Sequence, residues 1–105
     1  MAGASGFVGL HLIERLAATH PILALGRRAP SRSRDGVTWR QTELFSAGST
    51  RAALQGATVA IYLVHSMMPS SRLFQGSFHD TDLLLADNFA RACKKNGVQH
   101  ILYLG

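Results

Sequence analysis

Three glycines near the start of the chain have the spacing of a phosphate-binding loop. Gly3, Gly6 and Gly9 form a GxxGxxG pattern. In such a loop the first glycine permits a tight turn from a strand into a helix, and the second lets a pyrophosphate approach the free N–H groups at the helix N-terminus. The third lets the helix pack closely on the sheet. The pattern differs from the commoner GxGxxG, and taken alone it is explained equally well by an ordinary glycine-rich helix entry.

A group of arginines offers a second possible contact with an anion. The chain has eleven Lys+Arg against six Asp+Glu, a formal net charge of +5. Four of the arginines lie close together, at Arg27, Arg28, Arg32 and Arg34. Such an excess suits a nucleic acid, an acidic membrane or a phosphorylated small molecule. Nucleic-acid-binding surfaces usually interleave basic with aromatic residues. No aromatic residue lies among these arginines, so we expect no nucleic-acid partner. A solvated basic loop stays the alternative.

The sequence lacks the motifs of several other chemistries. Phe7 stands where a nucleophile elbow beginning at Gly3 needs a glycine, and no lysine follows the glycines as in a P-loop. The five histidines lack metal-ligand spacing, and the single cysteine, Cys93, excludes an internal disulfide or a paired-cysteine metal site. No apolar run reaches the length of a membrane span and no signal peptide opens the chain. We therefore expect a cytoplasmic protein that makes no membrane contact.

Helix and strand signals alternate along the chain and predict one α/β domain over residues 1–105. Helices are expected over 7–19, 49–55 and 80–95, with Ser49 capping the second and Asp80 and Asp82 at the start of the third. Strands are expected over 22–25, 37–42, 57–64 and 98–104, with a loop over 65–79. This order predicts a parallel sheet with helices on both faces. Only Met1 and Ala2 stand where a strand would precede the glycine turn.

Four segments together resemble one protein family. Residues 3–9 resemble the cofactor loop of the extended and atypical short-chain dehydrogenase/reductases. Residues 59–67, VAIYLVHSM, resemble the fourth strand and following loop of the NmrA-like, NAD(P)H-binding branch, which is related to the NAD-dependent epimerases and dehydratases. Residues 87–93 and 97–105 resemble its next helix and fifth strand. The resemblance covers essentially the whole chain and implies a partial Rossmann-type, doubly wound parallel sheet without its first strand and C-terminal part.

The resemblance implies a role for each matching position. The pyrophosphate would be held by Gly3, Ala4, Ser5, Gly6, Phe7, Val8 and Gly9. Arg27 and Arg28 match the positions after the family's second strand, where an NAD-binding protein carries an acid for the ribose 2′-hydroxyl. Arginines at these positions instead favour the 2′-phosphate of NADP. NAD stays an alternative cofactor.

Further positions are implied around the adenosine. Glu43 and Leu44 match an Asp-Leu pair whose acid binds the adenine amino group, with Glu in place of Asp as a departure. Leu63, Val64 and His65 would line the adenosine and nicotinamide-ribose side. Asn88, on the long helix, either packs near this loop or is a polar residue on the helix surface.

The catalytic Tyr-x-x-x-Lys of many family members has no match in this chain. Tyr62 is followed four residues later by Ser66, and Tyr103 lies two residues from the end. No catalytic residue is therefore assigned, and enzymatic activity stays open. We expect the NAD(P)(H)-binding portion of a larger oxidoreductase or epimerase, apparently a fragment, with NADP preferred. The alternatives are a non-catalytic NADP(H)-sensing module and a basic nucleic-acid-associated protein. Open sheet edges also suggest self-association.

Overall fold

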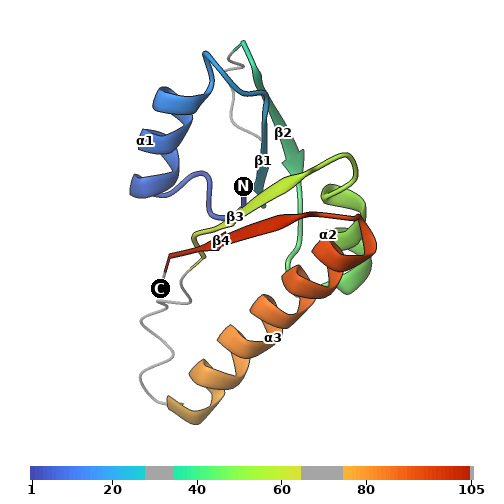
Figure 1. Cartoon of the computed structure of the whole chain (residues 1–105). Helices are drawn as coiled ribbons and strands as arrows, with labels where there is room; N and C mark the ends of the chain where they lie inside the picture. The colour runs from blue at the N-terminus through green and yellow to red at the C-terminus, as the bar shows by residue number, and fades with distance from the viewer. Residues whose placement is uncertain (28–34, 65–74, 105) are drawn as a thin grey trace.

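The computed structural model describes residues 1–27, 35–64 and 75–104, with only the backbone of residues 75–82. Its elements follow the order helix, strand, strand, helix, strand, helix, strand (Figure 1). They are α1 (Phe7–Leu16), β1 (Ile22–Gly26), β2 (Val37–Gln41), α2 (Ala47–Ala53), β3 (Val59–Tyr62), α3 (Gln75–Lys95) and β4 (His100–Tyr103). Among these helices none is both long and apolar enough to cross a membrane.

All strand pairs are parallel, as the alternation of elements predicts. β1 pairs with β2, from Ile22 opposite Val37 to Gly26 opposite Gln41. β3 pairs with β4 in the same direction, from Val59 opposite His100. Ala2 forms a parallel bridge to Leu25 of β1 and another to Tyr62 of β3, and so joins the two pairs.

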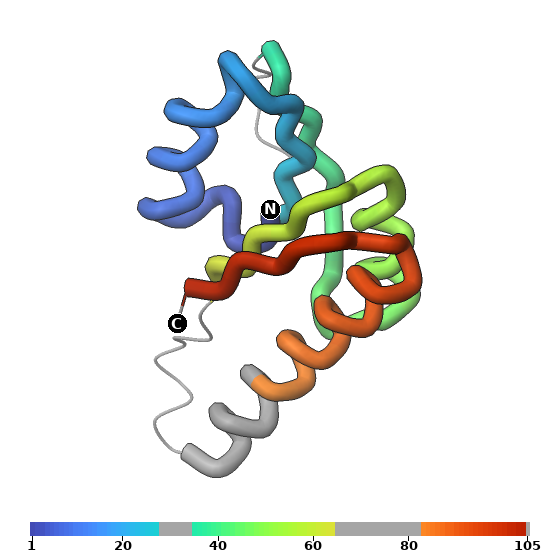
Figure 2. Tube along the Cα trace, in the orientation of Figure 1, coloured from blue at the N-terminus to red at the C-terminus, as the bar shows by residue number. Residues whose placement is uncertain are grey.

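Residues 1 and 2 thus occupy the central position of the sheet (Figure 2). The Ala2 N–H donates to the Ile61 carbonyl at 2.9 Å, and the Ala2 carbonyl accepts from the Leu63 N–H at 3.0 Å. The Met1 carbonyl accepts from the Leu25 N–H at 2.9 Å. Met1 and Ala2 therefore lie between β1 and β3, where the resemblance places the first strand.

Helices cover both faces of the sheet, which gives the doubly wound arrangement that the sequence predicts. On one face α1 packs through Ile13 against a cluster that includes Ala24 and Leu63. On the other face α2 and α3 meet the sheet, where the ring of Phe89 in α3 packs at a tilt against Tyr62 with ring centroids 5.0 Å apart. Figure 1 shows α1 on one side of the strands and α2 with α3 on the other.

A cavity of about 660 Å³ lies beside the amino-terminal half of β1 and along β3. Met1, Leu23, Val59 and Ile61 are among its lining residues. The Met1 amino group donates to the Leu23 carbonyl at 2.7 Å. Burial lowers the pKa of this amino group from 8.0 to about 6, because desolvation disfavours its charged form.

Several element ends differ from those expected. The second helix begins at Ala47, and its N-cap is Ser46, whose side chain accepts from the Ser49 N–H; Ser49 is therefore not the cap. The long helix begins at Gln75, so the loop expected up to residue 79 is wrong from 75 on, and Asp80 and Asp82 lie beyond the first turn. The stop expected at Gly97 is confirmed by its left-handed φ of 73°.

Candidate functional site

The candidate site lies at the edge of the sheet where the parallel strands end. The carboxyl ends of parallel strands share one edge, and ligands of open α/β sheets bind there. The glycine loop follows Ala2, Arg27 follows β1 and Glu43 comes soon after β2. Leu63 and Val64 follow β3. The topology therefore gathers the described site residues that the resemblance implies, while Arg28 and His65 lie outside the described residues.

Gly3 makes the tight turn out of the sheet. Its φ of +81° lies in the left-handed region that other residues rarely adopt. A Cβ at this position would also lie 2.9 Å from the Leu63 carbonyl carbon. The turn closes through a hydrogen bond from the Gly6 N–H to the Gly3 carbonyl, at 3.2 Å. The first glycine of the pattern is therefore required both by conformation and by the close approach of the loop after β3.

Gly9 lets α1 approach the turn that precedes it. A Cβ there would lie 2.6 Å from the carbonyl oxygens of both Gly3 and Ala4. The third glycine was expected to bring the helix close to the sheet, and its nearest neighbours are instead the backbone atoms of the turn. Ala4, between the two glycines, is completely buried on the α1 face of the sheet. The turn and the first turn of α1 are thus packed as one unit.

Gly6 leaves the N-terminus of α1 open. It is the N-cap in an extended conformation, with φ −79° and ψ 176°, and no side chain caps the helix. A Cβ at Gly6 would meet only the Gly3 carbonyl oxygen, at 3.4 Å. The first intrahelical bond joins the Leu10 N–H to the Gly6 carbonyl, so the N–H groups of residues 7–9 have no partner within the helix. The first turn carries no acidic residue, which suits an anionic ligand.

The side chains of this loop lie mainly toward solvent. Ser5, Phe7 and Val8 are exposed, Phe7 by 79%. The Phe7 ring packs beside His11, one turn along α1, with ring centroids 4.4 Å apart. The His11 Nδ1 lies 2.8 Å from the Phe7 carbonyl oxygen. Among residues 3–9 it is therefore the backbone, rather than a charged side chain, that offers hydrogen-bond donors to an anion.

Arg27 and Glu43 both line one cavity at this edge of the sheet. Its volume is about 300 Å³, and it is lined by Arg27, Gln41, Thr42, Glu43 and Ser49. The two strands are held in register at this end because the Thr42 N–H donates to the Gly26 carbonyl at 2.8 Å. Sixteen positions separate Arg27 from Glu43 in the sequence. The parallel pairing of β1 and β2 is what brings them together.

Glu43 begins a β-turn that several hydrogen bonds hold in place. The Ser46 N–H donates to the Glu43 carbonyl at 3.0 Å, which closes the turn. The Glu43 carboxylate accepts from the Phe45 N–H at 3.2 Å, and the Glu43 N–H donates to the Ser49 hydroxyl at 3.0 Å. The carboxylate is exposed yet fixed by its own turn.

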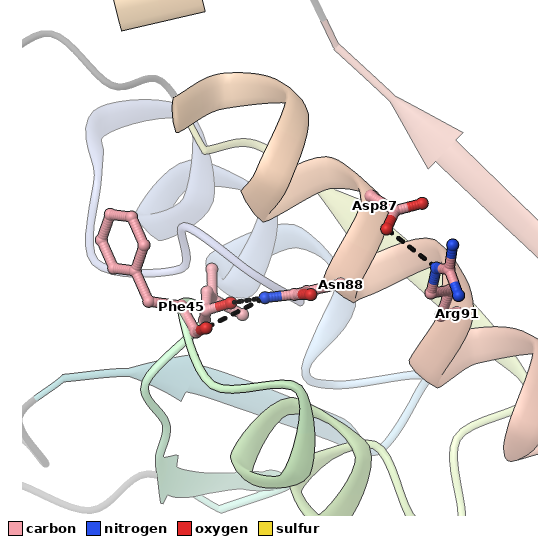
Figure 3. A network of polar contacts seen from close by, with 5 residues as sticks. Phe45, Asp87, Asn88 and Arg91 are labelled. Carbon is pink, nitrogen blue, oxygen red and sulfur yellow. Dashed lines mark hydrogen bonds and ion pairs between the residues drawn. The ribbon is translucent and has the colours of Figure 1, made fainter. Parts of the chain in front are cut away.

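Asn88 holds this turn from the long helix (Figure 3). Its Nδ2 donates to the carbonyl of Leu44 at 2.9 Å and to that of Phe45 at 3.1 Å. Asn88 is only 7% exposed, so the helix-surface alternative is wrong. The neighbouring pair Asp87 and Arg91 forms an exposed ion pair of 2.8 Å on the same helix. Sequence reasoning placed Asn88 near the loop after β3; its bonds go to the turn after β2.

Leu63 and Val64 contribute to the site through their backbone. Leu63 is 9% exposed and packs with the α1 cluster, and half-buried Val64 packs with the opposite cluster. The Leu63 backbone lies directly against Gly3. Leu44 is also half-buried, against the cluster that contains Phe89. These apolar residues position the loops that form the edge.

Sequence reasoning did not name Ser46, and it did not assign Ser49 or Asn88 to the Glu43 turn that they hold. Ser46 caps α2, which leaves the Ser49 hydroxyl to accept from Glu43. The signal for Ser46 was its place immediately before the small residues of α2. No local sequence pattern indicates that Asn88 binds this turn, because the two lie more than forty positions apart in the sequence.

Comparison with known proteins places the chain in a family. Residues 3–105 match the NAD(P)H-binding family. The auxiliary protein GraX of Staphylococcus aureus is 28% identical over 99% of this chain and 34% of its own length.

The fold recurs in solved structures of larger proteins. A nucleoside-diphosphate-sugar epimerase from Staphylococcus aureus aligns with a TM-score of 0.76 and 24% identity over 99% of this chain and 36% of its own. Uronate dehydrogenase from Agrobacterium tumefaciens aligns with a TM-score of 0.77 and 21% identity, over 99% of this chain and 38% of its own. This chain spans about a third of the length of these relatives. With its parallel sheet, its glycine loop and the match over residues 3–105, the chain belongs to the NAD(P)H-binding family.

Proposed function

We propose that this chain binds NADP(H) in preference to NAD(H), as the nucleotide-binding part of a larger protein of the oxidoreductase or epimerase kind. The observation that carries the proposal is the open N-terminus of α1 at the Gly3–Gly9 loop, on the same edge of the sheet as the cavity that Arg27 and Glu43 share. The free N–H groups suit a pyrophosphate. A structure of uronate dehydrogenase with NAD bound supports the cofactor class.

Arg27 is the basis of the proposed preference for NADP. It is exposed at the end of β1, in the same cavity as the Glu43 turn. A ribose bound at the end of this strand would present its 2′ position to the guanidinium, and an arginine pairs well with a phosphate there. A hydrogen bond to a charged group contributes about 1.5–3 kcal/mol, so we expect NADPH to bind at least about tenfold more tightly than NADH. Arg28 is proposed to act with Arg27.

The remaining site residues are proposed to surround the same cofactor. Residues 3–9 would hold the pyrophosphate, and Glu43 with Leu44 would meet the adenine. Leu63, Val64 and His65 would lie on the nicotinamide-ribose side. In this role Glu43 accepts a hydrogen bond from the adenine amino group through its exposed carboxylate.

Two readings of the whole protein follow from its relatives. Similarity to the fold of an epimerase and a dehydrogenase supports a catalytic parent. The 28% identity to an auxiliary protein supports a non-catalytic module that senses NADP(H). Assay of hydride transfer in the full-length parent separates them, because a sensor binds the cofactor without turning it over.

Isothermal titration of the chain with NADPH and with NADH tests the proposal. We expect NADPH to bind more tightly, and Arg27→Ala to remove most of the difference by weakening NADPH alone. Arg15→Ala, an exposed arginine in the last turn of α1, is the matched control and should leave both affinities unchanged. Equal affinities in the unmodified chain, or a preference that survives Arg27→Ala together with Arg28→Ala, would overturn the preference. A duplex DNA titration should give no specific binding.

Self-association through sheet edges is a further part of the proposal. Within the part of the chain that the structure describes, β1 and β3 are joined only through Met1 and Ala2, and β4 pairs on one side only. Exposed apolar side chains line β4 and the next residue, namely Ile101, Leu102, Tyr103 and Leu104. Exposed edges of this kind pair with other chains. Light scattering should report species larger than the monomer, and a strictly monomeric chain at high concentration would contradict this. A cytoplasmic location stays a prediction.

A further inference from the structure

A buried asparagine on α3 is placed where an apolar residue would be the simpler choice. Asn88 lies between Leu85 and Phe89 among the buried residues of this helix. A buried amide is costly unless its hydrogen bonds are made. Asn88 directs its amide donors to the successive carbonyls of Leu44 and Phe45. A helix that only needed to pack on α2 would have no use for these bonds.

The two carbonyls belong to the turn that carries the Glu43 carboxylate. Within the turn, the Phe45 N–H donates to that carboxylate and the Ser46 N–H donates to the Glu43 carbonyl. Since Asn88 holds the carbonyls of the two central residues, the peptide planes at Leu44 and Phe45 are fixed from the protein interior. The Phe45 N–H is thereby fixed as well, and with it the partner of the Glu43 carboxylate.

We infer that Asn88 is a positioning residue that sets the Glu43 turn for recognition of the adenine ring. This inference rests on the proposed function, in which Glu43 accepts from the 6-amino group of adenine. Asn88 itself does not touch the ligand; it acts through the carbonyls of Leu44 and Phe45. Replacing Asn88 should therefore weaken recognition of the 6-amino group of the purine and leave binding of the pyrophosphate and the nicotinamide unchanged.

The chain offers a close structural control at the end of the same helix, where Asn96 immediately follows Lys95. Asn96 also directs its Nδ2 to a carbonyl of the α2 region, that of Arg51, at 2.9 Å. It therefore ties α3 to α2 with the same chemistry but does not bind the 43–46 turn. Asn88→Leu and Asn96→Leu both remove an inter-element amide, and only the first should change purine recognition. Asp87→Ala, which removes the exposed ion pair with Arg91, is a second control.

Fluorescence titrations with NADPH and with its hypoxanthine analogue, which lacks the 6-amino group, test the inference. They are made well below the melting temperature of each variant. The unmodified chain should prefer NADPH by about tenfold, the effect of one hydrogen bond to a charged group. Asn88→Leu should reduce this ratio to near one, while reduced nicotinamide mononucleotide should bind all variants alike. Asn96→Leu and Asp87→Ala should keep the ratio.

The outcomes separate this inference from the proposed function. If the unmodified chain binds no NADPH, the proposed function fails and the inference fails with it. If it binds NADPH without preferring it to the hypoxanthine analogue, Glu43 does not read the amino group and the inference is overturned while NADPH binding stands. The inference is also overturned if Asn88→Leu keeps the preference, or if Asn96→Leu loses it equally. Should Asn88→Leu fail to fold, Asn88→Ala, which removes the donors without adding a charge, replaces it with the same expected loss.

Discussion

Replacing Gly9 by alanine perturbs the contact between α1 and the glycine turn. The new Cβ would lie 2.6 Å from the carbonyl oxygens of Gly3 and Ala4, well inside the 3.4 Å at which ordinary contact begins. Both oxygens belong to the backbone, and Ala4 is fully buried, so neither can rotate away as a flexible side chain would. The helix start and the turn must separate.

The energetic cost follows from two opposing effects. Overpacking typically costs about 1–3 kcal/mol. Alanine in a helix is favoured over glycine by up to about 1 kcal/mol. Because the contact involves backbone on both sides, we expect a net loss of about 2 kcal/mol from a domain whose total stability is on the order of 5–15 kcal/mol. At roughly 4–8 °C per kcal/mol, the melting temperature should fall by about 8–16 °C.

Alanine substitutions at two other glycines serve as comparisons for Gly9→Ala. A Cβ at Gly48, in α2, meets nothing within 4 Å, so Gly48→Ala should raise stability by up to about 1 kcal/mol. A Cβ at Gly6 meets only the Gly3 oxygen at 3.4 Å, and alanine is a poorer N-cap than glycine, so Gly6→Ala should destabilise the chain less than Gly9→Ala does but should bind NADPH more weakly. Circular-dichroism melts and NADPH titrations measure both effects. Unchanged melting of Gly9→Ala, or undiminished NADPH binding by Gly6→Ala, would refute the reasoning about the turn.

Two further predictions concern stability. The folded pKa of the Met1 amino group, about 6, lies below its usual 8.0, so the unfolded chain binds more protons between these values and stability rises with pH across this window. At about 1.36 kcal/mol per pKa unit, the free energy of unfolding should rise by at most roughly 3 kcal/mol. N-terminal acetylation should abolish this part of the pH dependence, measured by urea unfolding. An identical pH dependence after acetylation would contradict the assignment. Ser46→Ala removes the bond from the Ser49 N–H and should cost about 1 kcal/mol, measured as a lower urea midpoint with an unchanged m-value. An unchanged midpoint would show that the cap contributes nothing.

The architecture could be predicted because its signals are local. The apolar run around Ala60 and Tyr62 has the composition of a strand covered on both faces, and the structure buries both residues. Alternation of such runs with helical periodicity leaves a parallel sheet as the natural arrangement. Gly3 could be assigned to the tight turn because a positive φ favours glycine.

The polar contacts between elements could not be predicted in the same way. Ser46 and Ser49 are equally good caps by residue type, and only the path of the chain after β2 decides between them. Asn88 and its carbonyl partners are separated by more than forty positions, and nothing near Asn88 indicates which loop it reaches. The predicted start of α3 is too late because Asp80 and Asp82 are typical of a first helical turn, whereas the helix begins five residues before Asp80, at Gln75.

Backbone amide NMR during titration with NADPH tests the central claim most directly, since it reports where the cofactor binds. We predict saturable shifts confined to the carboxyl edge of the sheet: the Gly3–Gly9 turn, Arg27, the Glu43 turn and Leu63. The largest shifts should fall on the N–H groups of Phe7 to Gly9, which have no partner within α1. Shifts confined to the cavity beside Met1, Leu23 and Val59, or no saturable shifts at all, would contradict the account.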